Sequence, residues 1–298
     1  MRKGCSLAKM NAGKAEKGDG RKRNGFDSVC PIGRKKMTQN EKRVYLIREL
    51  LAERKAENDV TVPDDEVGQK RLLRSLFNVR MPKPVSDSFL KIQDEYLQTE
   101  IKKKGITDVD DLLPIFDDIY LWQGDITTLR CDAAVNAANS EMLGCFCPCH
   151  QCIDNAVHTF AGVELRKKCA EIMKAGGRRV SAGAAIITPA YNLPCKYVIH
   201  TVGPIVSSVP TKRDCELLEE CYRNCLEIAE KNGVGSIAFC CISTGEYRFP
   251  HRQAAEIAVR TVMQYKKRSN SRMKVIFNVF KDTDAEIYRE ILGEYRGA

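Results

Sequence analysis

The spacing of apolar and polar residues divides this 298-residue chain into a helical first part and a longer part in which strands and helices alternate. Between residues 38 and 103, apolar residues recur three and four positions apart, as in amphipathic helices. From Ile119 onward, short apolar runs alternate with helical patterns. Because such alternation over about 170 residues is typical of a layered α/β sheet, we predict a three-layer α/β/α domain.

The first part is expected to contain three helices. The first begins after Thr38, because Thr38 and Glu41 form the T-x-x-E pattern of a capping box. The second includes residues 72–77 and ends before the Pro82-Lys83-Pro84 step, and the third covers residues 87–103. We interpret these helices as a packing layer with no chemistry of its own.

The second part has six apolar runs and four helical patterns. We predict strands at 119–122, 133–136, 184–188, 197–201, 236–242 and 275–280, and helices at 153–174, 214–231, 251–267 and 284–295. Open α/β sheets bind ligands at the carboxyl ends of their strands. The strand exits at Gly124-Asp125 and at Ser243-Thr244-Gly245 are therefore expected to lie close together at one edge.

The net charge of +9 is concentrated at the start of the chain. Residues 1–36 hold 11 Lys and Arg against three acidic residues, whereas the rest of the chain is close to neutral. A stretch rich in Gly and Lys buries too little apolar surface to fold alone, so we predict a disordered tail. Binding of nucleic acid by this tail is a less favoured alternative, and it would weaken steeply with added salt.

The sequence favours a cytoplasmic protein with no membrane partner. No run reaches the roughly 18 consecutive apolar residues of a membrane helix, and the N-terminus lacks the apolar centre of a signal peptide. In the cytoplasm, the 14 cysteines are expected to be reduced thiols or metal ligands.

Four cysteines and one histidine lie within residues 145–152, between a predicted strand and a predicted helix. Cys145, His150 and Cys152 offer two thiolates and an imidazole, a ligand set that favours zinc. A catalytic site would use three ligands and keep one position open, whereas Cys147 or Cys149 could complete a closed structural site. Reduced cysteines without a metal are the third interpretation.

Several polar residues lie where a ligand would bind. Asp154, in the first turn of the predicted helix, could orient or deprotonate a water, or it could serve the helix through capping and the dipole. Asn136 and Asn139 could bind ribose hydroxyls or stabilise a turn. Asp125 could accept a hydrogen bond from the amino group of a base or cap a turn.

The segment Ser243-Thr244-Gly245 follows an apolar strand and precedes a helix. Its N–H groups and hydroxyls could form a cradle for phosphate, although a plain turn would use the same residues. We interpret the three histidines outside the cysteine-rich loop, His158, His200 and His251, as structural.

Four segments resemble the macrodomain, the α/β/α fold that binds ADP-ribose. They are Gln123-Gly124-Asp125-Ile126-Thr127, Asp132-Ala133-Ala134-Val135-Asn136-Ala137-Ala138-Asn139, Ile153-Asp154-Asn155-Ala156-Val157-His158 and Ile242-Ser243-Thr244-Gly245. Cys145, His150 and Cys152 replace the usual glycine-rich loop, which resembles the zinc-containing macrodomains of microbes. The resemblance implies a mixed central sheet, with an N-terminal helical extension (37–113) before the macrodomain (114–298). Only the basic tail (1–36) falls outside it.

The resemblance also implies an activity, that of a zinc-dependent protein-ADP-ribose hydrolase which removes mono-ADP-ribose from Asp and Glu side chains. Its partners would be ADP-ribose and a mono-ADP-ribosylated protein. Zn²⁺ would be held by Cys145, His150 and Cys152. Asn139 would contact the ribose next to the scissile bond, and Asp154 would help to orient the attacking water.

The other implied site residues surround the ligand. Asp125 would hold the adenine amino group with Ile126 beside it, and Phe280 would stack on the adenine. Cys152, Ile153 and Asp154 would contact the substrate, and the diphosphate would lie among Ser243, Thr244, Gly245, Glu246 and Tyr247.

Two other functions suit the same site. One is a module that binds ADP-ribose without cleaving it, in which zinc only orders the loop. The other is a deacylase of O-acyl-ADP-ribose. Release of ADP-ribose from a modified protein distinguishes a hydrolase from the first, and a comparison of turnover on protein and free O-acyl esters addresses the second.

Overall fold

The computed structural model describes residues 36–54, 60–177 and 179–296, and from Met37 onward the chain forms one compact unit. The predicted tail, residues 1–36, lies outside the described residues except for Lys36. The boundary between residues 113 and 114 stays a prediction. Within the described chain, every helix is too short or too polar to cross a membrane.

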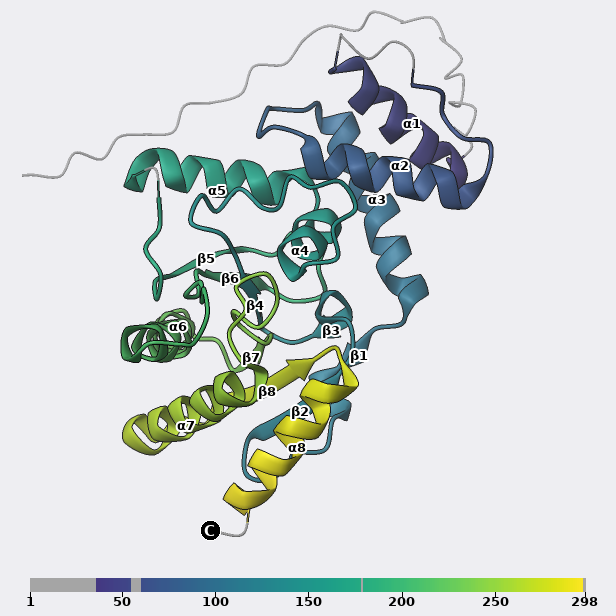
Figure 1. Cartoon of the computed structure of the whole chain (residues 1–298). Coiled ribbons are helices and arrows are strands. Elements are labelled where there is room, and N and C mark those ends of the chain that lie inside the picture. The colour runs from purple at the N-terminus through teal and green to yellow at the C-terminus, as the bar shows by residue number, and fades with distance from the viewer. Residues whose placement is uncertain (1–35, 55–59, 178, 297–298) are drawn as a thin grey trace, which may run out of the picture. The chain divides into compact units, whose positions relative to one another are not determined.

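Three helices open the described chain, α1 (Gln39–Ala52), α2 (Glu66–Val79) and α3 (Asp87–Lys104) (Figure 1). The predicted capping box is confirmed: the Thr38 hydroxyl accepts the N–H of Glu41, and the Glu41 carboxylate accepts the N–H of Thr38. The helices share a buried apolar cluster that includes Leu46, Leu73, Phe77, Phe89, Leu97 and Val163.

A six-stranded sheet, in the order β2-β8-β7-β4-β6-β5, forms the centre of the second part. Its strands are β2 (Ile119–Gln123), β4 (Ala133–Ala137), β5 (Ala185–Pro189), β6 (Tyr197–Thr201), β7 (Ser236–Phe239) and β8 (Lys274–Val279). All neighbours are parallel except β5, which pairs antiparallel with β6 at the edge. The predicted mixed sheet is confirmed. Two further strands of two residues each, β1 (Thr107–Asp108) and β3 (Leu129–Arg130), form a separate parallel pair that was not predicted.

Helices cover both faces of this sheet (Figure 1). One layer contains α4 (Ile153–Ala161) and α5 (Val163–Gly176), and the other contains α6 (Lys212–Lys231), α7 (His251–Ser269) and α8 (Asp282–Arg296). The central strands are buried on both faces, with Val135, Ile237 and Val275 fully inaccessible. The predicted three-layer α/β/α architecture is therefore confirmed.

The single helix predicted over residues 153–174 is two helices, divided at Gly162. Gly162 has a φ of 95°, which L side chains rarely adopt. A Cβ at this position would lie 2.7 Å from Nε2 of Gln93, because Gln93 of α3 accepts the N–H of Val163 there. A side chain of the helical extension thus fills the space at the junction between α4 and α5. The strand predicted over 236–242 is also shorter, because the ladder ends at Phe239 and the chain leaves the sheet.

Candidate metal centre and active site

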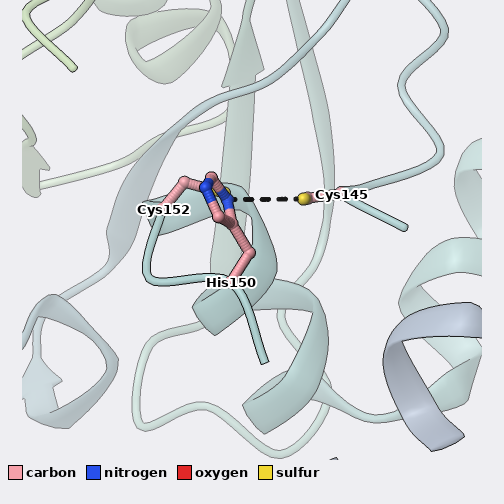
Figure 2. A group of neighbouring side chains, drawn as sticks. All are labelled: Cys145, His150 and Cys152. Carbon is pink, nitrogen blue, oxygen red and sulfur yellow. Dashed lines mark hydrogen bonds between the residues drawn. The ribbon is translucent and has the colours of Figure 1, made fainter. Parts of the chain in front are cut away.

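The loop of residues 145–152, called here the metal loop, brings three potential ligands together between β4 and α4. The ligand atoms of Cys145, His150 and Cys152 lie within 4.8 Å of one another. Cys145 Sγ is 3.6 Å from His150 Nδ1 (Figure 2). Two thiols and an imidazole at this spacing form a donor set that suits zinc.

The other two cysteines of the metal loop do not join this trio. The Cys149 thiol donates to the main-chain oxygen of Arg71 at 3.4 Å, and Cys147 is exposed. The backbone at Cys149 has a positive φ of 55°, so the loop turns between the ligands at this residue. The geometry favours three protein ligands over four.

Cys152 also begins α4. Its Sγ occupies the N-cap position and accepts the N–H of Asn155 at 3.4 Å. Burial raises the pKa of the Cys152 thiol to about 12, whereas the hydrogen bond from Asn155 acts in the opposite direction. Because a cysteine caps the helix, the carboxylate of Asp154 is left for other contacts.

Asp154 is buried and faces Asn136 of β4 and Asn139, two residues after that strand. Its Oδ1 accepts the Asn136 amide at 2.8 Å, and its Oδ2 lies 3.4 Å from the Asn139 amide nitrogen. Burial raises the pKa of Asp154 to about 6, against the opposing effects of the Asn136 hydrogen bond and the Arg166 charge. The structure therefore brings together Asn136, Asn139 and Asp154, three candidate site residues, beside Cys152.

A buried network of hydrogen bonds extends from Asp154 through Asn136 to His200. The same Asn136 amide nitrogen lies 3.1 Å from Nδ1 of His200, and Nε2 of His200 lies 3.1 Å from the Thr188 hydroxyl. Since an amide nitrogen donates, Nδ1 of His200 accepts and its Nε2–H donates to Thr188. Burial lowers the pKa of His200 to about 4, so the ring is neutral. The structural interpretation of His200 is consistent with these contacts.

His158 and Cys169 lie beside His200 and complete a second group of neighbouring ligand atoms. Both ring nitrogens of His200 are already used by Asn136 and Thr188. Burial, with a contribution from the Arg166 charge, lowers the pKa of His158 well below its usual value, so this ring is also neutral. We interpret this group as part of the core under the site.

The loop of residues 243–247 lies against the metal loop. Oε1 of Glu246 is 3.5 Å from Nε2 of His150. Burial, with a contribution from the nearby Asp154 charge, raises the pKa of Tyr247. The N–H of Phe249 donates to the Ser243 carbonyl at 2.9 Å, and Ser243 has a φ of 65°.

The Ser243 hydroxyl is directed at Gly203, where a Cβ would come within 1.9 Å of its Oγ. This oxygen is buried and has no hydrogen-bond partner among the described residues. The packing explains why a glycine occupies position 203, a requirement that the sequence alone did not reveal.

Asp125 lies at the carboxyl end of β2 and caps a short 3₁₀ turn at residues 126–128. Its Oδ1 accepts from the N–H and hydroxyl of Thr127, and its Oδ2 accepts the ammonium of Lys104 at 2.9 Å. Burial raises the pKa of Asp125, but the hydrogen bonds from Thr127 and Lys104 outweigh it and lower the pKa overall. The carboxylate is therefore ionised and available as an acceptor, while Ile126 beside it is buried.

The strand exits at Gly124 and Cys241 flank β8 at the carboxyl edge of the sheet. The Asn278 side chain donates to the Gly124 carbonyl at 2.9 Å, and the Asn278 carbonyl accepts the Cys241 thiol at 3.9 Å. Both predicted site segments thus lie at one edge, as expected, with one strand between them. Phe280, the residue after β8, is 76 % exposed at the same edge.

Comparison with known proteins identifies the family. The Macro domain profile matches residues 135–258. A protein-ADP-ribose hydrolase of Treponema medium is 56% identical over 260 residues, which span 86% of this chain and 100% of that relative. The chain belongs to the macrodomain family. This macrodomain is also 49% identical over 248 residues to a protein-ADP-ribose hydrolase of Staphylococcus aureus (strain MSSA476), covering 83% of the chain and 93% of the relative.

A solved structure agrees with this assignment. The Trypanosoma brucei macrodomain in complex with ADP-ribose matches with a TM-score of 0.58 at 28% identity, over 74% of this chain and 95% of that one. Two residues of the present macrodomain that touch the predicted site were not found from the sequence. They are Lys104 of α3, which pairs with Asp125, and Arg74 of α2, which contacts the metal loop. Both come from helices that the sequence pattern shows only as a packing layer.

Proposed function

We propose that this macrodomain is a zinc-dependent protein-ADP-ribose hydrolase that releases mono-ADP-ribose from acidic side chains of proteins. The observation that carries the proposal is the position of Asp154, two residues after a potential zinc ligand and within reach of both site asparagines. The hydrolases of T. medium and S. aureus support the reaction class.

The ligand would lie along the carboxyl edge of the sheet. Asp125 would accept the adenine amino group, with Ile126 beside it and Phe280 as a stacking partner. The 243–247 segment would surround the diphosphate, and Asn139 would contact the ribose next to the scissile bond. Cys152 and Ile153, at the start of α4, would contact the same ribose.

Zinc fits the trio of Cys145, His150 and Cys152, because thiolate and imidazole are the donors it prefers and their atoms lie close enough to share one ion. Bound there, it would supply Lewis-acid chemistry next to the scissile ribose. The trio must stay reduced to bind a metal, so a reducing compartment such as the cytoplasm is part of the proposal.

The protein's own residues would position the water. Oδ1 of Asp154 is held by Asn136, whereas Oδ2 has only the longer contact to Asn139. Oδ2 is therefore the atom available to accept a hydrogen bond from a water or a ribose hydroxyl. Asn139 is fixed in turn by donating to the Gly144 carbonyl at 3.1 Å, directly before Cys145.

Metal content and activity measured on one sample test this proposal. We expect zinc bound to the purified chain, release of ADP-ribose from a protein modified on Asp and Glu, loss of release after chelation, and recovery when zinc is returned. Full turnover without zinc would contradict the mechanism. Tight ADP-ribose binding without release at any zinc occupancy would instead indicate a binding module.

A further inference from the structure

Helix α2, outside the α/β/α layers, makes direct hydrogen bonds to the metal loop. Nη2 of Arg74 donates to the main-chain oxygen of His150 at 2.9 Å. Nη2 and Nε of the same guanidinium donate to Oδ1 of Asn155 at 2.9 and 3.2 Å. One planar side chain thus joins a ligand residue of the loop to the first turn of α4.

Asn155 links Arg74 to Cys152, another of the three potential zinc ligands. It is fully buried, and its N–H donates to Sγ of Cys152 at 3.4 Å. Its side-chain amide donates to the carbonyl of Cys147 at 3.0 Å. Because Arg74 occupies Oδ1 of Asn155, the amide is held in the orientation that reaches Cys147.

Two further contacts bind the same helix to the loop. Oδ1 of buried Asn78, one turn after Arg74, accepts the N–H of Cys149 at 2.8 Å. On the other side of the loop, buried Arg166 donates to the carbonyl of Leu143 at 2.7 Å and also to the carbonyl of Phe77 in α2 at 2.9 Å. Helix α2 therefore holds the metal loop directly at Cys149 and His150, and Arg166 of α5 links α2 to Leu143, two residues before the loop begins.

We propose that α2 is a brace for the metal loop and that Arg74 is a positioning residue that sets the loop's affinity for zinc. The inference rests on the proposed zinc-dependent function. The three ligands lie within eight residues of loop, whose own backbone would otherwise have to be ordered when a metal binds. Contacts that fix this backbone in advance lower that cost, and groups behind the ligands typically alter metal affinity by about 10- to 100-fold.

The experiment compares zinc affinities of full-length chains by competition with a chromophoric chelator. We expect Arg74→Ala to weaken zinc binding by about 10- to 100-fold. Arg74→Lys keeps the charge but lacks the planar guanidinium that reaches two acceptors at once. Its zinc affinity should therefore lie between those of wild type and Arg74→Ala. Arg48→Ala removes an exposed arginine of α1 and serves as the control with unchanged affinity.

A second readout distinguishes positioning from general damage to the fold. At saturating zinc, ADP-ribose release by Arg74→Ala should return toward the wild-type rate, because the catalytic groups are still present. If Arg74→Ala folds and its zinc affinity is within about twofold of wild type, the proposal that Arg74 positions the metal loop is wrong. If that variant does not fold, wild-type affinity in Arg74→Lys would lead to the same conclusion. If the wild-type chain itself binds no zinc, the proposed zinc-dependent function is wrong. This outcome is distinct from zinc binding that is unaffected by Arg74→Ala.

Discussion

At the scale of single residues, the two ends of the candidate site depend on carboxylates in different surroundings. Asp154 is buried, and its pKa is raised to about 6 by that burial. Asp125 is partly exposed and paired with an ammonium, and its pKa is lowered by the hydrogen bonds that outweigh burial. This difference suits the proposed roles, in which an ionised Asp125 would accept the adenine amino group and Asp154 would orient the attacking water.

Replacing Asp154 by asparagine tests its role in turnover. Asp154→Asn keeps the size of the side chain but removes the carboxylate, so we expect kcat to fall by about 10²- to 10⁴-fold with little change in the Kd for ADP-ribose. Calorimetry and an ADP-ribose release assay measure the two quantities. Glu141→Gln, at an exposed acid before the metal loop, is the matched control. Equal losses in binding and turnover would argue against a role confined to the reaction.

Lys104 should set the pH range of ligand binding. It is one of the groups that lower the pKa of Asp125, so Lys104→Met should raise that pKa. A lowered pKa keeps the carboxylate ionised until the pH falls through the folded-state value. We therefore expect the acid loss of ADP-ribose binding to begin at higher pH in the variant than in wild type.

Calorimetric titrations from neutral to acid pH measure this shift. Lys103→Met removes the neighbouring charge, which pairs with Glu100 instead, and should leave the profile unchanged. Profiles of wild type and Lys104→Met that superimpose would show that Asp125 is not the titrating acceptor.

At the scale of elements, Asp132 joins the beginnings of three strands. Its carboxylate accepts the N–H groups of Gly235, directly before β7, and of Ser236, the first residue of β7, at 2.8 and 3.1 Å. It also accepts the ammonium of Lys196, directly before β6, at 2.7 Å. Asp132 itself directly precedes β4. The carboxylate thus helps to align the register of neighbouring parallel strands.

We expect Asp132→Ala to lower the free energy of unfolding by about 1–3 kcal/mol, because two main-chain donors lose their acceptor. Burial raises the pKa of Asp132, but the bonds from Lys196 and the two N–H groups lower it overall. Its stabilisation is therefore present above the unfolded-state pKa and is lost as the pH falls through the folded value. Urea unfolding at pH 7 and at acid pH should show the variant and wild type converging in acid. A difference that persists unchanged in acid would contradict this account.

At the scale of the whole molecule, the layered fold and the potential ligands could be predicted from the sequence, because both follow from local patterns. Apolar runs mark the buried strands, and Cys145, His150 and Cys152 are close together in the chain. The contacts of Arg74 and Lys104 could not be predicted, since their partners lie 76 and 21 residues away. The division at Gly162 depends on Gln93, which belongs to another helix.

The order of the strands determines when the sheet can be completed. β8, near the end of the chain, lies between β2 and β7, so the first strand of the sheet pairs only with the last. About 150 residues separate Gln123 from Lys274, which a ribosome adds in roughly 8–30 s. During this time β2 is an unpaired edge that other chains could join. A nascent chain released before β8 would have β2 detached from the four strands that carry the metal loop.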